Sequence, residues 1–360
     1  MKGKKMAQTE LELKDIMASI KVAFKQRVAT LIQVGSKGAV LACRKNEDLT
    51  PETYRVTTYK SAVFELEDKD LETKIKQIFN GGTSKVILLE YADTFASVQD
   101  VIKTKLNWNW LCSFEADDQT TVSSYCKENQ KFGLVYNVKA DSKWVCSVNN
   151  PSAVLADGVT INESSEITGL DLIPIVVGVI AGCPYTKSIS YKIFTELESV
   201  TLPETIEEGQ ITLYNEDEGV RVASPVNTLL STDDENTEDM KSICIVEGMK
   251  RVEEDMIYAF RTGYKGKYKN DYNHQCLFLS AGEYYITQLE EMGIFDPGYD
   301  NTIDIDVETQ RALWKAQGKD ADSWDEQTVK ETTYKNMFYP KLDVKFLDAI
   351  EGMEMTVEMF

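Results

Sequence analysis

The stretch that decides the fold is Gly219-Val220-Arg221-Val222-Ala223-Ser224-Pro225-Val226-Asn227-Thr228-Leu229, in the second half of the chain. After the glycine, valines alternate with a polar residue, a pattern typical of a β-strand. Ile211–Tyr214 is also strand-like, and the acidic turn Asn215-Glu216-Asp217-Glu218 separates the two. This order predicts a β-hairpin that leads into Pro225 and the VNTL tetrapeptide.

The chain beyond the hairpin predicts strands and helices in turn. Apolar runs and helix-stop glycines place these elements, with Gly293 ending the longest helix. We expect a strand at Ser242–Val246, helices at Arg251–Arg261 and Gln275–Met292, a strand at Thr302–Val307 and a helix at Glu308–Gln317.

Upstream of the hairpin, residues 61–150 alternate between helix and strand patterns, which predicts a small α/β domain. The expected helices are Asp70–Phe79, Val98–Lys105 and Thr120–Asn129, and the expected strands are Lys85–Tyr91, Trp108–Phe114, Gly133–Val138 and Lys143–Val148. Gly81-Gly82 precedes a strand, whereas a dinucleotide loop must follow one, so a helix C-cap is the better account.

Asn149-Asn150-Pro151 suggests a boundary between domains. Asp171–Gly182 is expected to be a buried helix with Pro174 in its first turn.

Both ends of the chain alternate between apolar and polar residues, which predicts strands with one apolar face. Near the start the apolar members are Leu11 and Leu13, and near the end they are Leu342, Val344, Phe346, Met353, Met355, Val357 and Met359. Chain ends are normally polar and poorly ordered. We therefore expect both ends to be docked, either on the same subunit or on another.

Length and charge limit the classes of protein that this chain can be. A chain of 360 residues suggests two or three domains. The net charge of −20 argues against binding to nucleic acid or to an anionic membrane, because phosphate contact needs a basic face. The apolar stretch from Ile173 to Cys183 has 11 residues, too few to span a bilayer. The charged residues that follow Thr9 do not fit a signal peptide.

The residues that usually carry catalysis or hold metals are few. The 7 cysteines are scattered and form no CxxC pair, so we expect buried free thiols in a reducing cytosol. His274 is the only histidine and cannot build a histidine-rich metal site. Asp304 and Asp306 share one face of an expected strand, but in so acidic a protein a solvated face is the simpler interpretation. The sequence therefore predicts no enzyme, no cofactor and no metal.

The order of motifs in the second half resembles that of contractile tail sheath proteins, which form the sheaths of myophages and phage-tail-like bacteriocins. The glycine–strand–VNTL signature is carried by Gly219, Val226, Asn227, Thr228 and Leu229. A helix then leads into a Y-x-G-K…N turn with Tyr264, Gly266, Lys267 and Asn270. The resemblance covers about residues 165–360, and its specificity lies in this ordered succession. Pro225 stands where the family often has glycine.

The resemblance implies a structural protein with a mixed α/β fold. It implies an N-terminal arm (1–30), a variable outer α/β domain (31–150), a sheath core (151–340) and a C-terminal strand arm (341–360). Subunits would form hexameric rings stacked helically around a tail tube protein and would contract to drive the tube through a cell envelope. Strands from the arms would join the sheets of neighbours. Baseplate and tail terminator proteins would be further partners, in a virion or phage-tail-like particle assembled in the host cytoplasm.

Two charged segments suggest contacts in such a particle. Arg261, Lys265, Lys267 and Lys269 form a basic cluster that is either a solvated turn or a contact with an acidic tube or neighbour. Asp233–Asp239 has 5 acidic residues in 7 and is either a solubilising loop or a source of repulsion between subunits.

Two other functions remain open at this point. An α/β nucleotide-binding protein or enzyme would account for the alternation in 61–150, although no glycine-rich βα turn supports it. A tail tube or baseplate protein is the other alternative. Because tube proteins are chiefly β, the two long helices expected after residue 250 argue against it.

Overall fold

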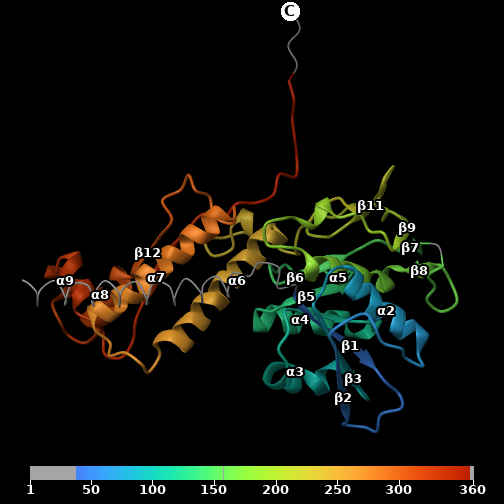
Figure 1. The fold of residues 1–360 in the computed structure, drawn as a ribbon, viewed down its shortest axis with the longest axis horizontal. Helices are drawn as coiled ribbons and strands as arrows, with labels where there is room; N and C mark the ends of the chain where they lie inside the picture. The colour runs from blue at the N-terminus through green and yellow to red at the C-terminus, as the bar shows by residue number, and fades with distance from the viewer. Residues whose placement is uncertain (1–37, 157, 357–360) are drawn as a thin grey trace, which may run out of the picture. The chain divides into compact units, whose positions relative to one another are not determined.

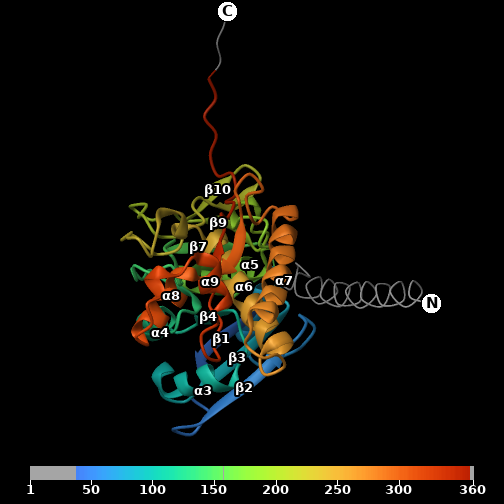
Figure 2. The same ribbon diagram turned by 90° about the vertical axis from the view of Figure 1, so that its left-hand side faces the viewer.

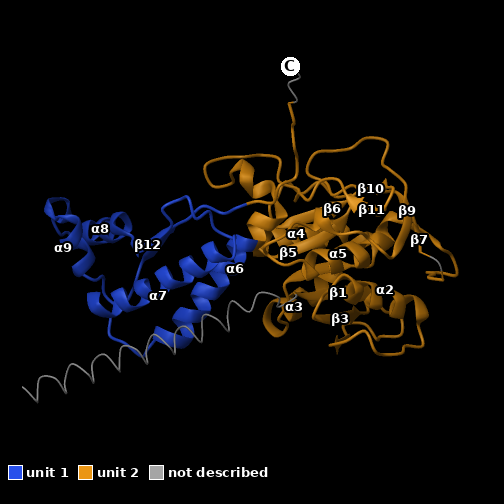
Figure 3. Cartoon of the chain, turned by 45° about the horizontal axis from the view of Figure 1, so that its top comes forward, with its two compact units in different colours: residues 1–34, 248–347 blue, residues 35–247, 348–360 orange. Residues whose placement is uncertain are grey.

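The structure is a computed structural model that describes residues 38–156 and 158–356. It divides into two compact units (Figure 3). Among the described residues, unit 1 comprises 248–347, and unit 2 comprises 38–247 and 348–356. The compact units do not follow the boundary expected at residue 150, because 151–247 belongs to the same unit as 38–150. The expected role of 31–150 as a variable outer domain stays a prediction.

Unit 2 is built on a six-stranded sheet in the order β2-β3-β1-β4-β5-β6 (Figure 1). All neighbours pair in parallel except β2, which joins β3 antiparallel at the edge. The strands are β1 (Ala39–Lys45), β2 (Tyr54–Tyr59), β3 (Lys85–Tyr91), β4 (Trp110–Ser113), β5 (Phe132–Tyr136) and β6 (Val145–Val148). The alternation predicted for 61–150 is confirmed, and β3 has the predicted bounds.

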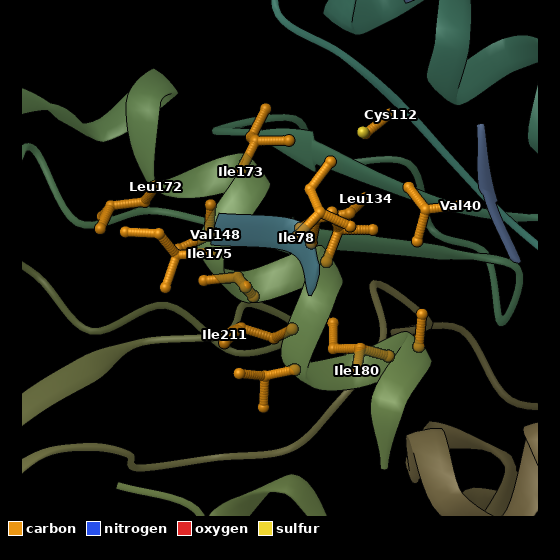
Figure 4. Packing of buried hydrophobic residues seen from close by; sticks show 14 of the residues in the cluster. Val40, Ile78, Cys112, Leu134, Val148, Leu172, Ile173, Ile175, Ile180 and Ile211 are labelled. Atoms are coloured by element: carbon orange, nitrogen blue, oxygen red, sulfur yellow. The ribbon is translucent and has the colours of Figure 1, made fainter. Parts of the chain in front are cut away.

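Helices cover both faces of this sheet, as a parallel sheet requires. Val40 and Ala42 of β1 pack on the side of α2 (Lys69–Asn80) and α5 (Ile173–Gly182), where Ile78 and Ile180 are fully buried (Figure 4). Leu41 and Cys43 face the opposite core, beneath α3 (Gln99–Lys105) and α4 (Gln119–Asn129). The core of unit 2 is therefore closed on both sides.

Glycines let α2 and α5 approach closely. A Cβ atom on Gly178 of α5 would lie 2.5 Å from the carbonyl oxygen of Ile78, and one on Gly81 would lie 2.1 Å from the backbone of Gly178. Gly81 caps α2, and its N–H donates to the Gln77 carbonyl. The C-cap predicted for Gly81-Gly82 is confirmed, and the pair also provides this helix contact. Pro174 lies in the first turn of α5, as expected.

Smaller sheets complete unit 2. β7 (Ser152–Leu155) pairs with β8 (Glu166–Thr168) and β9 (Leu197–Val200). β10 (Leu213–Glu216) and β11 (Gly219–Val222) form the predicted antiparallel hairpin. Gly219 has φ +133°, a conformation that favours glycine, and the side chain of Ile193 leaves no room for a Cβ.

Unit 1 combines helices with a two-stranded sheet. α6 (Ile243–Ala259) begins in unit 2, enters unit 1 at Gly248 and ends in a π-helical turn, Phe260–Tyr264. Within unit 1, α7 (Tyr272–Glu291) runs alongside α6 (Figures 1 and 2), and the Tyr285 hydroxyl donates to Asp255 at 2.9 Å. The remaining elements are β12 (Thr302–Ile305), α8 (Val307–Ala316), α9 (Glu326–Glu331) and β13 (Pro340–Asp343).

Two expectations from the sequence need correction. Ser242–Val246 is not a strand, because Ile243–Val246 forms the first turn of α6. Ile243, Ile245 and Val246 are all buried in unit 2, so this turn is apolar on every side and lacks the helical period. Met353–Thr356 form no strand in the single chain. Leu11, Leu13, Val357 and Met359 lie outside the described residues.

Candidate assembly site

The two-stranded sheet of unit 1 is incomplete at both edges. β12 and β13 pair antiparallel from Thr302 opposite Asp343 to Ile305 opposite Pro340. No further strand joins this sheet among the described residues. Two strands alone are marginally stable in water, and an unpaired edge presents main-chain donors and acceptors to another chain. The sheet can therefore accept a strand at each side.

The segment 340–347 continues the strand beyond β13 and alternates strictly. Leu342, Val344 and Phe346 are partly buried, whereas Lys341, Asp343 and Lys345 are exposed. The predicted shared face of Leu342, Val344 and Phe346 is thus confirmed. Phe346 anchors the end: it bridges to Phe295, and the two rings stand perpendicular with centroids 4.9 Å apart.

An apolar groove lies between the inward face of this strand and α6. Its volume is about 530 Å³, and Glu253 is the only charged residue in its lining. Glu253 is paired with Lys250 at 2.8 Å. Besides Leu342, Val344 and Phe346, the lining includes Met249, Val252, Met256, Ile257, Phe260, Phe278, Ile303, Phe338 and Pro340. We call this space the β13 groove.

A second groove lies between β12 and α7 and differs in character. Its volume is about 580 Å³. Its lining carries three carboxylates, from Glu283, Glu290 and Asp304, and no basic side chain. Asp304 pairs with Lys330 at 2.5 Å, and Glu290 accepts a hydrogen bond from Asn301 at 2.7 Å. We call this space the β12 groove. An apolar strand fits the first groove better than the second.

The C-terminal segment leaves apolar side chains without cover. After Leu347 the chain lies on unit 2, where Asp348 accepts a hydrogen bond from Ser242 at 2.9 Å and Glu351 accepts one from Ser190 at 3.1 Å. Beyond these anchors, Met353 is 80% exposed and Met355 is 70% exposed. One molecule thus carries both an open groove and an uncovered apolar strand sequence.

The VNTL residues hold the scaffold of unit 2. Asn227 is 1% exposed; its side-chain amide donates to the Met240 carbonyl at 2.7 Å and its oxygen accepts from the Leu229 N–H. Thr228 donates through its hydroxyl to the Ser142 carbonyl at 3.0 Å. Leu229 is buried, and Val226 makes a bridge to Ser242. These residues tie the loop after the hairpin to β6 and to the start of α6.

The Y-x-G-K…N residues shape the turn between α6 and α7. The Tyr264 ring packs edge-on against Phe278 at 5.1 Å, and Gly266 has φ +75°. Lys267 donates from Nζ to the Thr262 carbonyl at 2.5 Å. Asn270 donates to the carbonyls of Lys335 and Met337 at 3.1 and 3.0 Å, which links this turn to the segment before β13. The motif therefore helps to fix the segment that leads into β13 of the two-stranded sheet.

The basic cluster lies on the surface at this same turn. Arg261, Lys265, Lys267 and Lys269 are all exposed, and none forms an ion pair with another described residue. Tyr258 and Tyr268 nearby are also exposed. The cluster is thus available for a contact with an acidic partner, and that contact stays a prediction.

The remaining candidates for chemistry have structural roles. Asp271 caps α7 and holds the His274 ring nitrogen at 2.6 Å; hydrogen bonds from His274 lower the pKa of Asp271. Asp306 caps α8, whereas Asp304 pairs with Lys330, so the two carboxylates do not act together. Within 38–156 and 158–356, no group of three or more His, Cys, Asp or Glu is placed to hold a metal ion, and no helix is long and apolar enough to cross a membrane.

The sequence pattern does not single out one further acid, Glu247, which is partly buried in the structure. Glu247, the last residue of unit 2 on α6, accepts a hydrogen bond from the Trp110 indole at 2.7 Å. Burial raises the pKa of Glu247 to about 8, against the lowering effect of that hydrogen bond. The thiols of Cys146, Cys183 and Cys244 are its titratable neighbours. Within the described part of the chain, no Lys, Arg or His forms an ion pair with Glu247, so the neutral acid is favoured at neutral pH.

Comparisons with known proteins place this geometry in context. A family model described as the phage tail sheath C-terminal domain matches residues 235–360. A curated tail sheath protein from Clostridium phage phiCD119 is 25% identical over 368 residues, which span 95% of this chain and 99% of that protein. The resemblance inferred from the sequence motifs is confirmed.

Solved structures share the fold. A sheath tail protein from Desulfitobacterium hafniense is similar with a TM-score of 0.60 at 14% identity, over 77% of this chain and 91% of that one. A chain from the contracted helical sheath of the anti-feeding prophage is similar with a TM-score of 0.65 at 12% identity, over 91% of this chain and 94% of that one. The mixed α/β fold predicted from the sequence is confirmed.

Proposed function

We propose that this chain is a structural subunit of a contractile tail sheath, which polymerises around a tail tube and contracts to drive the tube through a target envelope. The similarity to sheath proteins extends over nearly the whole chain and includes its fold. Its work requires packing and charge rather than a chemical step, and the described candidates for catalysis serve as helix caps and ion pairs.

The observation that carries this proposal is that one molecule has both a sheet with open edges and an apolar C-terminal segment without cover. Among the described residues no strand pairs with either outer edge of the β12–β13 sheet, and the C-terminal segment leaves Met353 and Met355 exposed. A strand from another subunit would satisfy both, because added strands gain main-chain hydrogen bonds and place alternate side chains in pockets. We infer that arms 9–17 and 341–360 join the sheets of neighbouring subunits.

The finer features of the particle belong to the same proposal. We place the subunits in hexameric rings stacked helically, with the tube protein inside and baseplate and tail terminator proteins at the ends. The basic cluster around Lys265 is the proposed contact with an acidic tube or neighbour. Assembly would take place in the host cytoplasm, and the product would be a virion or phage-tail-like particle.

Electron microscopy of the full chain, expressed with and without its tube protein, tests the function. We expect hollow striated cylinders, whereas monodisperse particles under all conditions would contradict a sheath. Deleting 352–360 tests the arm, because this truncation leaves β13 and its groove intact. The truncated chain should be folded and soluble with an unchanged melting temperature, and it should form no cylinders. Cylinders built from the truncated chain would exclude C-terminal strand exchange.

A further inference from the structure

We propose that residues 353–359 of a second copy of this chain dock beside β13 in a single register, with Thr356 opposite Asp343, and that Lys341 and Lys345 select this register by pairing with Glu354 and Glu358. The inference rests on the proposed function, since it specifies how the exchanged C-terminal strand is recognised.

The apolar face of the donor segment 353–359 suits the apolar lining of the β13 groove. Met353, Met355, Val357 and Met359 occupy every second position, so one face of an extended strand carries all four. Beside β13, that face would lie over the β13 groove, whose lining is almost wholly apolar and includes Met249 and Met256. Methionine is unbranched and fills irregular apolar space, which suits a groove of about 530 Å³.

The outward-facing residues of the two segments have the same spacing, and their end residues carry opposite charges. On the outward face of the acceptor, exposed Lys341, Asp343 and Lys345 are spaced two residues apart. On the outward face of the donor, Glu354, Thr356 and Glu358 have the same spacing. With Thr356 opposite Asp343, each glutamate faces a lysine. The match holds for either strand direction, because both triplets are symmetric about their central residue. Opposite charges directly across two strands stabilise pairing, and like charges oppose it.

Other registers are disfavoured by the same residues. A slip of one residue would turn the methionines to solvent and the glutamates into the groove. A slip of two would place Glu354 or Glu358 opposite Asp343, with like charges facing each other. The triplets therefore exclude the neighbouring alignments as well as favouring one.

The β12 groove is the competing acceptor, and its charge opposes this donor. Glu283, Glu290 and Asp304 line it, and the last ten residues carry three glutamates and no lysine or arginine. The chain's own tail is also held elsewhere, because Asp348 and Glu351 are bonded to Ser242 and Ser190 of unit 2. Charge complementarity thus favours the β13 groove of a second copy.

Charge exchange at a single position tests the register. Lys345 is already paired with Asp296 at 2.9 Å, so Lys341 is the cleaner site. We expect Lys341→Glu to raise the lowest protein concentration that yields cylinders by about tenfold, since it replaces an attractive cross-strand pair by a repulsive one. A second substitution should restore assembly: Glu358→Lys if the strands are antiparallel, or Glu354→Lys if they are parallel. Lys319→Glu, an exposed lysine of unit 1 away from the groove, is the control with the same change in charge.

The outcomes separate this inference from the function on which it rests. Rescue by one of the two glutamate substitutions, with an unchanged melting temperature for every variant, supports the register and reveals the strand direction. Assembly by Lys341→Glu at the wild-type concentration, or rescue by neither substitution, overturns the register. If deletion of 352–360 still abolishes cylinders in that case, strand exchange stands and only its register is wrong.

Discussion

The two units of this chain differ in how completely their β-sheets are covered and paired. Unit 2 surrounds a six-stranded sheet with helices on both faces, and its strands are almost completely buried except for the exposed edge strand β2. Unit 1 contains a sheet of two strands with an open groove beside each strand. The first sheet is completed by its own chain, and the second has room for more strands than the described chain gives it.

This difference indicates where stability and where assembly reside. A covered parallel sheet buries enough apolar surface to fold without partners. A two-stranded sheet does not, so its remaining stabilisation must come from helices or from added strands. We interpret unit 2 as the rigid body of the subunit and unit 1 as the part that other subunits complete.

The largest expected effect comes from truncating an apolar side chain in each unit. Ile180→Ala removes a fully buried side chain from α5, and we expect the free energy of unfolding to fall by about 2–5 kcal/mol. Val344→Ala removes a partly exposed side chain from the β13 groove, and we expect a loss below about 1 kcal/mol together with a loss of cylinders. Urea denaturation and electron microscopy measure the two quantities. If Ile180→Ala and Val344→Ala lowered the free energy of unfolding equally, the distinction drawn between the two units would be wrong.

The sequence predicted unit 2 better than the assembly site. The bounds Lys85–Tyr91 follow from the sequence because a buried strand is rich in apolar residues, here the four residues from Val86 to Leu89. Apolar alternation also revealed the inward face of Leu342, Val344 and Phe346. The β13 groove could not be predicted, because it arises where α6 meets Phe338, Val344 and Phe346, which lie far along the chain from that helix. Spacing along α6 at Met249, Val252 and Met256 does follow the helical period, and was the available signal.

An intermediate effect concerns Glu247, the partly buried acid of unit 2. Because the pKa of Glu247 is raised to about 8 in the folded chain, the folded state binds its proton more tightly than the unfolded state, where the value is near 4.5. Stability should therefore fall as the pH rises from about 4.5 to about 8. We expect a loss of about 1–3 kcal/mol, less than the full shift implies because Glu247 keeps some solvent contact.

Glu247→Gln isolates this contribution, since its amide oxygen can still accept the Trp110 hydrogen bond. The variant should show a smaller decline in the free energy of unfolding over the same pH range. Asp233→Asn is a useful contrast, because hydrogen bonds from the Asn236 and Glu235 backbone lower the pKa of Asp233 instead. Parallel pH profiles for wild type and Glu247→Gln would show that this acid does not remain protonated in the fold.

The smallest effect on stability distinguishes the charged loops of the two units. Lys265 and Lys269 of unit 1 are exposed, and substituting both with Glu while keeping Lys267, which holds the Thr262 carbonyl, should change the free energy of unfolding by less than about 0.5 kcal/mol. If the cluster faces an acidic tube, the fraction of cylinders that contain a tube should fall several-fold at low salt, and added salt should weaken the wild-type contact in the same way.

The acidic loop of unit 2 supplies the matched control for that experiment. Asp234, Glu235 and Asp239 can be neutralised while Asp233 is kept, because the Asp233 side chain holds the loop through backbone hydrogen bonds at 2.7 and 2.9 Å. This variant shifts the net charge in the opposite direction from the lysine variant, and we expect it to leave the content of tubes unchanged. If both variants lose tubes equally, the loss is not specific to the basic cluster, and the proposed role of unit 1 in holding the tube is wrong.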